Sequence, residues 1–135
     1  MALFAWNSSF SVQVAEIDKQ HQQLIELIGR LHDAMSINQG KSVIEQILAE
    51  MVDYISFHFS TEEKYMQQFG YGEYEQHRRE HEDFVHKTGL FQEDYANGKR
   101  ALTGEVLDFL YMWVENHILH TDRKYTECFK ENGLA

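Results

Sequence analysis

The stretch ISFHFSTEEKYM, residues 55–66, decides how the chain folds. On a helix, His58 and Glu62 lie one turn apart and on the same face as the apolar residues Ile55 and Met66. An imidazole and a carboxylate would then point into the core, where a polar group without a partner costs about 2–7 kcal/mol. The stretch therefore predicts a core helix whose buried polar side chains share a compensating partner.

Apolar residues recur at three- and four-residue steps along the rest of the chain, and no proline interrupts them. The predicted helices span about 18–38, 41–69, 73–96 and 102–129. Asp18 is a candidate cap for the first helix, and the NQG stretch at 38–40 is expected to end it. Gly98 is expected to end the third helix in a left-handed conformation. We expect an all-α, up-down antiparallel four-helix bundle that forms one domain over residues 1–135.

An arm of residues 1–17 precedes the first predicted helix and is too apolar for a disordered tail. Its large apolar side chains are Phe4, Trp6, Phe10, Val12, Val14 and Ile17. We expect this arm to pack across the bundle.

The composition argues against several classes of partner. A net charge of -10 opposes binding to nucleic acid, which depends on clustered lysine and arginine. No apolar run approaches the roughly 18 residues of a membrane span, and no basic residue precedes Lys19 as in a signal peptide, so a cytoplasmic protein without membrane insertion is expected. The single Cys128 leaves nitrogen and oxygen as the donors for any metal ion.

Each predicted helix carries histidine on its core stripe. The candidate metal ligands are His21, His58, Glu62, His77, His81, His117 and Asp122. Side chains four residues apart converge beside a helix, and these seven ligands exceed what one tetrahedral zinc ion uses. Because of this number of ligands, the sequence predicts two metal ions. Imidazole ligands suit zinc, copper, iron and nickel. If both carboxylates and one further oxygen bridge two octahedral ions, one position stays open for a small neutral ligand.

Asp122 follows His117 by five residues, so on a regular α-helix their side chains point about 140° apart around the helix axis. We expect a π-type widening between them, or an approach of Asp122 from the flank. Outside the ligand pattern, His32, His86 and His120 are expected to be exposed or to lie beside the ligands.

Two further predictions concern residues near the ligands. Tyr125 is expected to pack in the core, with a contact to a ligand as the alternative. A solvated acidic face is expected for Glu73, Glu75, Glu80 and Glu82.

The combined motifs VAEIDKQH at 14–21, HFSTEEKYM at 58–66, HRREH at 77–81 and WVENHILHTDRKY at 113–125 resemble the hemerythrin family, in particular its stand-alone bacterial members. The resemblance covers nearly the whole chain. It implies two iron ions, one held by His77, His81 and His117 and the other by His21 and His58. It also implies that Glu62, Asp122 and an oxo or hydroxo group bridge the two ions.

By the same resemblance, a group of apolar residues that would otherwise read as ordinary core forms the wall of a dioxygen pocket. These residues are Leu24, Ile25, Phe59, Trp113 and Val114.

The resemblance implies reversible binding of dioxygen, for its transport, storage or delivery, and no enzymatic activity. Five imidazoles and two carboxylates supply less negative charge than carboxylate-rich di-iron bundles do, which favours reversible binding over cleavage of dioxygen. A di-iron enzyme or stress protein acting on peroxide, nitric oxide or damaged iron clusters is the alternative, as is an oxygen or redox sensor. The recipient of the dioxygen is left open between an oxygen-consuming enzyme, a respiratory chain and an oxygen reserve, and we expect a monomer, with an oligomer left open.

Overall fold

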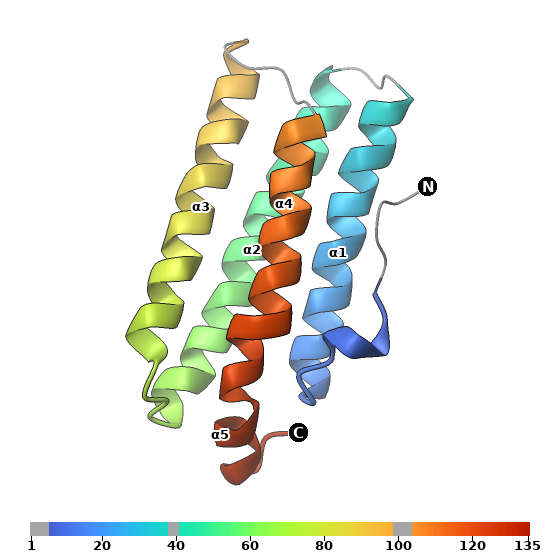
Figure 1. Ribbon diagram of the computed structural model, residues 1–135. Coiled ribbons are helices and arrows are strands. Elements are labelled where there is room, and N and C mark those ends of the chain that lie inside the picture. The colour runs from blue at the N-terminus through green and yellow to red at the C-terminus, as the bar shows by residue number, and fades with distance from the viewer. Residues whose placement is uncertain (1–5, 38–40, 99–103) are drawn as a thin grey trace.

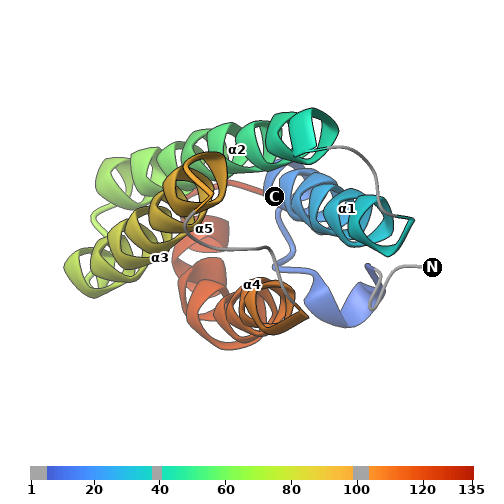
Figure 2. The ribbon, with the colours of Figure 1, turned by 90° about the horizontal axis from the view of Figure 1, so that it is seen from above.

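The computed structural model describes residues 6–37, 41–98 and 104–135. Four long helices run side by side: α1 (Ala15–Ser36), α2 (Lys41–Gln68), α3 (Tyr74–Ala96) and α4 (Gly104–Asn116) (Figure 1). Seen from above, α1 packs against both α2 and α4, and α2 packs against α3 (Figure 2). Because short connections join consecutive helices, neighbours are antiparallel. The predicted all-α antiparallel bundle is confirmed.

The fourth helical column changes its hydrogen-bond pattern along its length. After α4 come a π-helical turn, η2 (His117–Thr121), a 3₁₀ turn, η3 (Asp122–Tyr125), and a final short helix, α5 (Thr126–Glu131). In Figure 1, α5 extends this column toward the C-terminus. The predicted start of this column at 102, the NQG stop at 38–40 and Phe4 lie outside the described residues.

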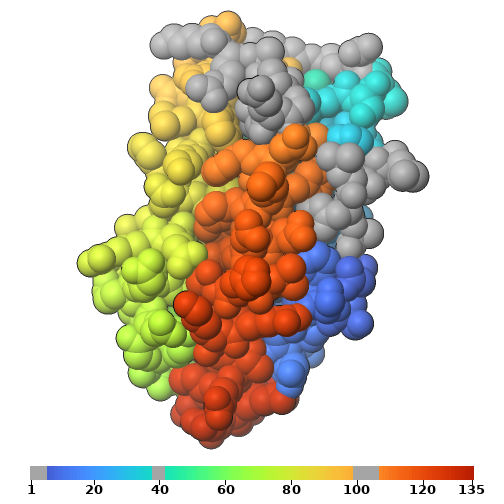
Figure 3. All heavy atoms as spheres, viewed as in Figure 1, coloured from blue at the N-terminus to red at the C-terminus, as the bar shows by residue number. Residues whose placement is uncertain are grey.

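The described part of the N-terminal arm packs across the bundle, as predicted, and includes a 3₁₀ turn, η1 (Ser8–Phe10). In Figure 3 its described part, in blue, lies against the lower half of the orange and red fourth column. Val12 and Val14 are buried, the Thr126 hydroxyl donates to the Val12 carbonyl at 3.1 Å, and Arg123 donates to the Ser9 carbonyl. The arm is thereby attached to the segment that carries Asp122.

The role predicted for Asp18 is wrong, because α1 begins at Ala15 and Val14 occupies its N-cap. Asp18 lies in the first turn instead. Its carboxylate accepts the Val12 amide at 2.8 Å and the Ser11 hydroxyl at 2.5 Å. Both donors belong to the arm, so Asp18 ties the arm to α1 rather than capping a helix. The end of α3 agrees with the prediction: Gly98 follows it with φ +70°, a conformation that other residues rarely adopt.

Two apolar clusters form the core. The larger one lies between the upper parts of the helices and includes Leu24, Ile55 and Phe84, whereas the smaller one includes Val12 and Phe129. The predicted metal ligands lie between the two clusters along α1, α2 and the fourth column, so apolar packing encloses them from both ends. No described helix is long and apolar enough to cross a membrane.

Candidate metal centre

All seven predicted ligands converge at one level of the bundle. Each is almost fully buried, with exposures of 4 % or less: His21, His58, Glu62, His77, His81, His117 and Asp122. One comes from α1, two from α2, two from α3 and two from the fourth column. The i, i+4 spacing within α2 and α3 directs both members of each pair inward, as the helical period requires.

The donor atoms form two groups that share two residues. One group contains His77, His81, His117, Glu62 and Asp122, and the other contains His21, His58, Glu62 and Asp122. Within each group the donor atoms lie within 4.8 Å of one another. Only the two carboxylates belong to both groups, and a carboxylate has two oxygens with which to bind two cations at once. The geometry therefore suits two adjacent metal ions.

The three histidines of the first group are spaced as ligands of one ion would be. The Nε2 atom of His117 lies 3.0 Å from Nε2 of His81 and 3.1 Å from Nε2 of His77. Two nitrogens bound at right angles, each about 2.1 Å from a metal ion, lie about 3.0 Å apart. An oxygen of Asp122 approaches the same point, with Oδ1 at 3.0 Å from His117 Nε2 and 2.9 Å from His77 Nε2.

The second group lies around Oδ2 of Asp122 and both oxygens of Glu62. His21 Nε2 lies 3.1 Å from Asp122 Oδ2 and 3.5 Å from Glu62 Oε2. His58 Nε2 lies 3.6 Å from Glu62 Oε1, and the rings of His21 and His58 are 4.5 Å apart. This group has two imidazoles where the first has three, so it is the less crowded of the two.

Asp122 reaches the centre because the helix widens directly before it. Its amide donates to the carbonyl of His117, five residues earlier, across the π-helical turn η2. Such a turn uses one residue more than an α-helical turn, so residues five apart come to lie on nearly the same face. The predicted widening between His117 and Asp122 is confirmed.

Hydrogen bonds from outside the cluster orient three of the imidazoles. Nδ1 of His81 lies 2.9 Å from Glu63 Oε2, Nδ1 of His117 lies 3.3 Å from Glu80 Oε1, and Nδ1 of His58 lies 2.7 Å from Gln20 Oε1. Since an oxygen without hydrogen can only accept, each Nδ1 carries a hydrogen, which leaves Nε2 as the nitrogen that can offer a lone pair to a metal ion. Two lone pairs 3.0 Å apart would repel each other, so His81 and His117 need either a proton or a metal ion between their Nε2 atoms.

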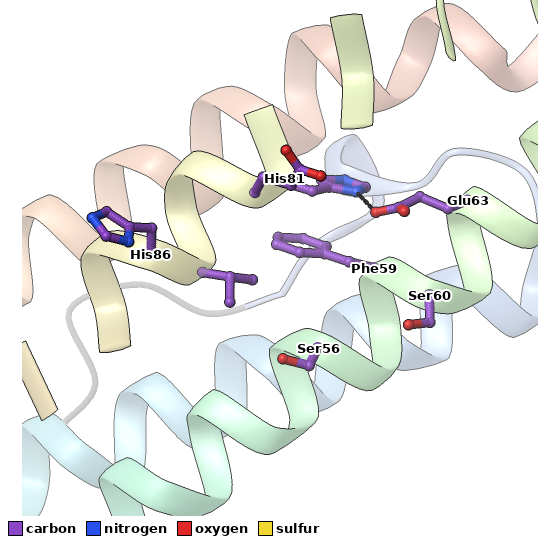
Figure 4. A pocket seen from close by; sticks show the side chains of 8 residues that line it. Ser56, Phe59, Ser60, Glu63, His81 and His86 are labelled. Carbon is purple, nitrogen blue, oxygen red and sulfur yellow. Dashed lines mark hydrogen bonds and ion pairs between the residues drawn. The ribbon is translucent and has the colours of Figure 1, made fainter. Parts of the chain in front are cut away.

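Glu63 and His81 also border a groove of about 420 Å³ between α2 and α3. Figure 4 shows the Glu63 side chain reaching from α2 to the ring of His81, with the ring of Phe59 beside it. The Phe59 ring stacks on His81 with centroids 3.7 Å apart and planes 2° apart. Phe59 thus covers the centre from this side. Glu63 lines the groove and at the same time forms a hydrogen bond with the predicted ligand His81.

Gln20, Glu63 and Glu80 were not among the predicted site residues. The prediction that Glu80 belongs to a solvated face is wrong, because it is half-buried and also accepts the Thr121 hydroxyl at 3.0 Å. One sequence signal was available, since each of the three adjoins a predicted ligand. Adjacency alone does not show which helix a side chain will reach.

The charges of the centre depend on one another. Burial opposes ionisation of Asp122, yet the neighbouring His117, His21 and His77 hold its pKa well below the usual range. Burial likewise opposes protonation of His21 and His117, but the nearby carboxylates outweigh it and raise their pKa values to about 9 and about 10. The cluster therefore holds buried anions that attract positive charge.

Among the described residues, several donor atoms of the cluster are buried without a hydrogen-bond partner. These are both nitrogens of His21, Nδ1 of His77, Oε1 of Glu62 and both oxygens of Asp122, although His21 and His77 lie within ion-pair distance of Asp122. Buried polar atoms without partners are rare because they are costly, and those of Glu62 and Asp122 lie where the two donor groups meet. Metal ions would satisfy the inward-facing atoms together, so the donor set fits a two-metal centre.

Tyr125 combines its two predicted roles. It is completely buried and stacks on Phe129 at 4.3 Å, and its hydroxyl donates to Glu62 Oε2 at 2.5 Å. Burial, together with the carboxylates of Glu62 and Asp122, raises the pKa of its phenol well above the usual value. The phenol therefore stays protonated and holds one oxygen of a shared carboxylate in place.

A small cavity adjoins the two-histidine group. It measures about 10 Å³, and its lining residues are His21, Leu24, His58, Phe59, Trp113, Val114, His117, Ile118 and Asp122. Four of the five predicted pocket residues are among them. Ile25 is buried in the core but does not line the cavity, and Ile118 is an additional wall residue. This volume is about the least that holds one water molecule.

The histidines outside the pattern stay apart from the ligand cluster. His86 and His120 are exposed, and His32 is half-buried with Nδ1 at 3.5 Å from Asp33. His86 borders the groove between α2 and α3 without joining the donor groups.

Comparison with known proteins agrees with this geometry. The family model described as Hemerythrin HHE cation binding domain matches residues 12–128. The bacteriohemerythrin of Clostridium acetobutylicum is 30% identical over 132 residues, which cover 93% of this chain and 100% of that protein. The bacteriohemerythrin of Methylococcus capsulatus is 30% identical over 129 residues, covering 95% of this chain and 98% of that protein.

Solved structures show the same architecture. A crystal structure of wild-type hemerythrin superposes with a TM-score of 0.89 at 30% identity, covering 94% of this chain and 98% of that one. The buried histidine and carboxylate cluster, the family match and the structural likeness together show that this chain belongs to the hemerythrin family.

Proposed function

We propose that the chain binds dioxygen reversibly at two iron ions and carries, stores or delivers it. His77, His81 and His117 would hold one ion, and His21 and His58 the other, with Glu62 and Asp122 shared between them. An oxo or hydroxo group would complete the bridge. When bound, the two ferrous ions would supply the two electrons that reversible binding of dioxygen draws on.

The single observation that carries this proposal is the position of the small cavity. It touches both histidines of the two-histidine group but only one of the other three, and most of its wall is apolar. An apolar space of this size excludes a large or charged substrate and leaves a small neutral molecule as the class of ligand it can take. Dioxygen is a small neutral ligand of this class.

The apolar wall also protects the bound state. Phe59 and Val114 are buried, and Trp113 stacks on His117 at 4.3 Å. Excluding water from this space removes the proton source that would otherwise promote irreversible oxidation. The protein residues thus favour release of the ligand unchanged, as a carrier requires. An oxygen-consuming enzyme is one of the recipients that such a carrier would serve.

An oxygen titration tests the proposal. The reduced, iron-loaded protein is expected to change its absorption spectrum in air and to recover the original spectrum under vacuum, over repeated cycles. A spectrum that fails to recover, or steady turnover of peroxide or nitric oxide, would favour a di-iron enzyme instead.

A further inference from the structure

A chain of hydrogen bonds connects one ligand of the two-histidine group to the backbone of α2. His58 Nδ1 lies 2.7 Å from Gln20 Oε1, and Gln20 Nε2 donates to Thr61 Oγ1 at 3.4 Å. The Thr61 hydroxyl donates in turn to the carbonyl of Phe57 at 3.2 Å. Gln20 and Thr61 are buried, so water does not compete readily for these groups.

The direction of each bond follows from the last one. A main-chain carbonyl can only accept, so the Thr61 hydrogen points to Phe57 and the Thr61 oxygen is left to accept. It accepts from the amide nitrogen of Gln20, which turns the amide oxygen of Gln20 toward His58. His58 must then donate from Nδ1, and its Nε2 lone pair faces the donor cluster.

We propose that Gln20 and Thr61 are positioning residues, which fix His58 in the tautomer that can bind metal. They also leave the metal ion beside His21 and His58 with less electron density from its ligands than the ion beside the three other histidines. The proposal rests on the two-metal function above. Its second part follows from charge, because the corresponding partners of His81 and His117 are the carboxylates Glu63 and Glu80. A carboxylate partner raises the basicity of a ligating imidazole more than a neutral amide does.

The first test reads the tautomer directly in metal-free protein. In Thr61→Val, nothing fixes the Gln20 amide, and nitrogen NMR of His58 is expected to show loss of the single Nδ1–H tautomer, which Thr61→Ser should restore. Thr88→Val is the matched control, because Thr88 is also buried and donates to a carbonyl four residues earlier, that of Phe84, at 3.0 Å. An unchanged His58 tautomer in Thr61→Val would overturn the proposal.

The second test measures metal binding by competition with a chelator. Loss of such a partner of a ligand typically lowers metal affinity about 10–100-fold. Thr61→Val leaves Gln20 present but unfixed, so we expect a loss of up to that size for one of the two ions in Thr61→Val and none in Thr88→Val; equal affinities in the two variants would overturn the proposal. If the unaltered chain binds fewer than two ions, the proposed function fails instead, whereas the tautomer result stands by itself.

The electronic part is tested with Gln20→Glu, which gives His58 a carboxylate partner like those of His81 and His117. The midpoint potential of the iron-loaded protein is expected to fall, and that of Glu63→Gln to rise. Shifts in the same direction for the two variants, or no shift in either, would contradict the assigned difference between the two positions.

Discussion

Replacing Tyr125 by phenylalanine removes one hydroxyl from the centre of the molecule and leaves the ring. The lost contact is the hydrogen bond to Glu62 Oε2 at 2.5 Å, in a position with 0 % exposure on both side chains. A hydrogen bond to a charged group contributes about 1.5–3 kcal/mol, and no water can take the place of this one. The Phe129 stacking, at 4.3 Å, is retained, so the apolar packing should change little.

We therefore expect Tyr125→Phe to lower the free energy of unfolding of the metal-free protein by about 1.5–3 kcal/mol, about tenfold or more in the unfolding equilibrium. Tyr65→Phe is the matched control. Its hydroxyl also donates to a carboxylate, that of Glu16 at 2.5 Å, but at an exposed position where such changes usually stay within about 0.5 kcal/mol. Urea denaturation followed by circular dichroism measures both. Equal losses in the two variants would refute the reasoning from burial.

Three further predictions concern the centre and its wall. Asp122→Asn keeps the side chain's shape but removes an anion shared by both donor groups, so at least one of the two metal ions per chain should be lost, as counted by elemental analysis; full occupancy would contradict the sharing. His21 and His117 have raised pKa values, of about 9 and about 10, so in metal-free protein they contribute stability below pH 6.5 that is lost as pH rises through those values, and urea denaturation should show a decline absent from metal-loaded protein. Phe59→Leu removes the ring stacked on His81 and enlarges the cavity, so spectra recorded in air should show faster irreversible oxidation; an unchanged rate would show that Phe59 does not exclude water.

The helical period explains why so much of the centre could be predicted. His58 with Glu62, and His77 with His81, are four residues apart, so their common face follows from local geometry alone. The five-residue step to Asp122 conflicts with that period, and the conflict itself predicted the π-helical turn that the structure contains. A violation of a local rule at a functional residue is informative because something else must compensate for it.

Local rules failed where the partner lies on another element. Aspartate is a common residue at helix N-caps, which is why Asp18 was predicted as one. Its partners are instead the Val12 amide and the Ser11 hydroxyl of the arm, and helical periodicity does not predict where the arm lies. Glu80 reads as a surface residue in its own helix and becomes half-buried because Thr121 and His117 approach from the fourth column. Such contacts depend on how the helices are packed against one another, which the spacing within one helix does not determine.

Anomalous diffraction from crystals of the iron-loaded protein tests the central claim most directly. We predict two iron peaks per chain, one beside His77, His81 and His117 and one beside His21 and His58, with the carboxylates of Glu62 and Asp122 between them. A single peak, or two peaks that do not both contact those carboxylates, would contradict the shared two-metal centre.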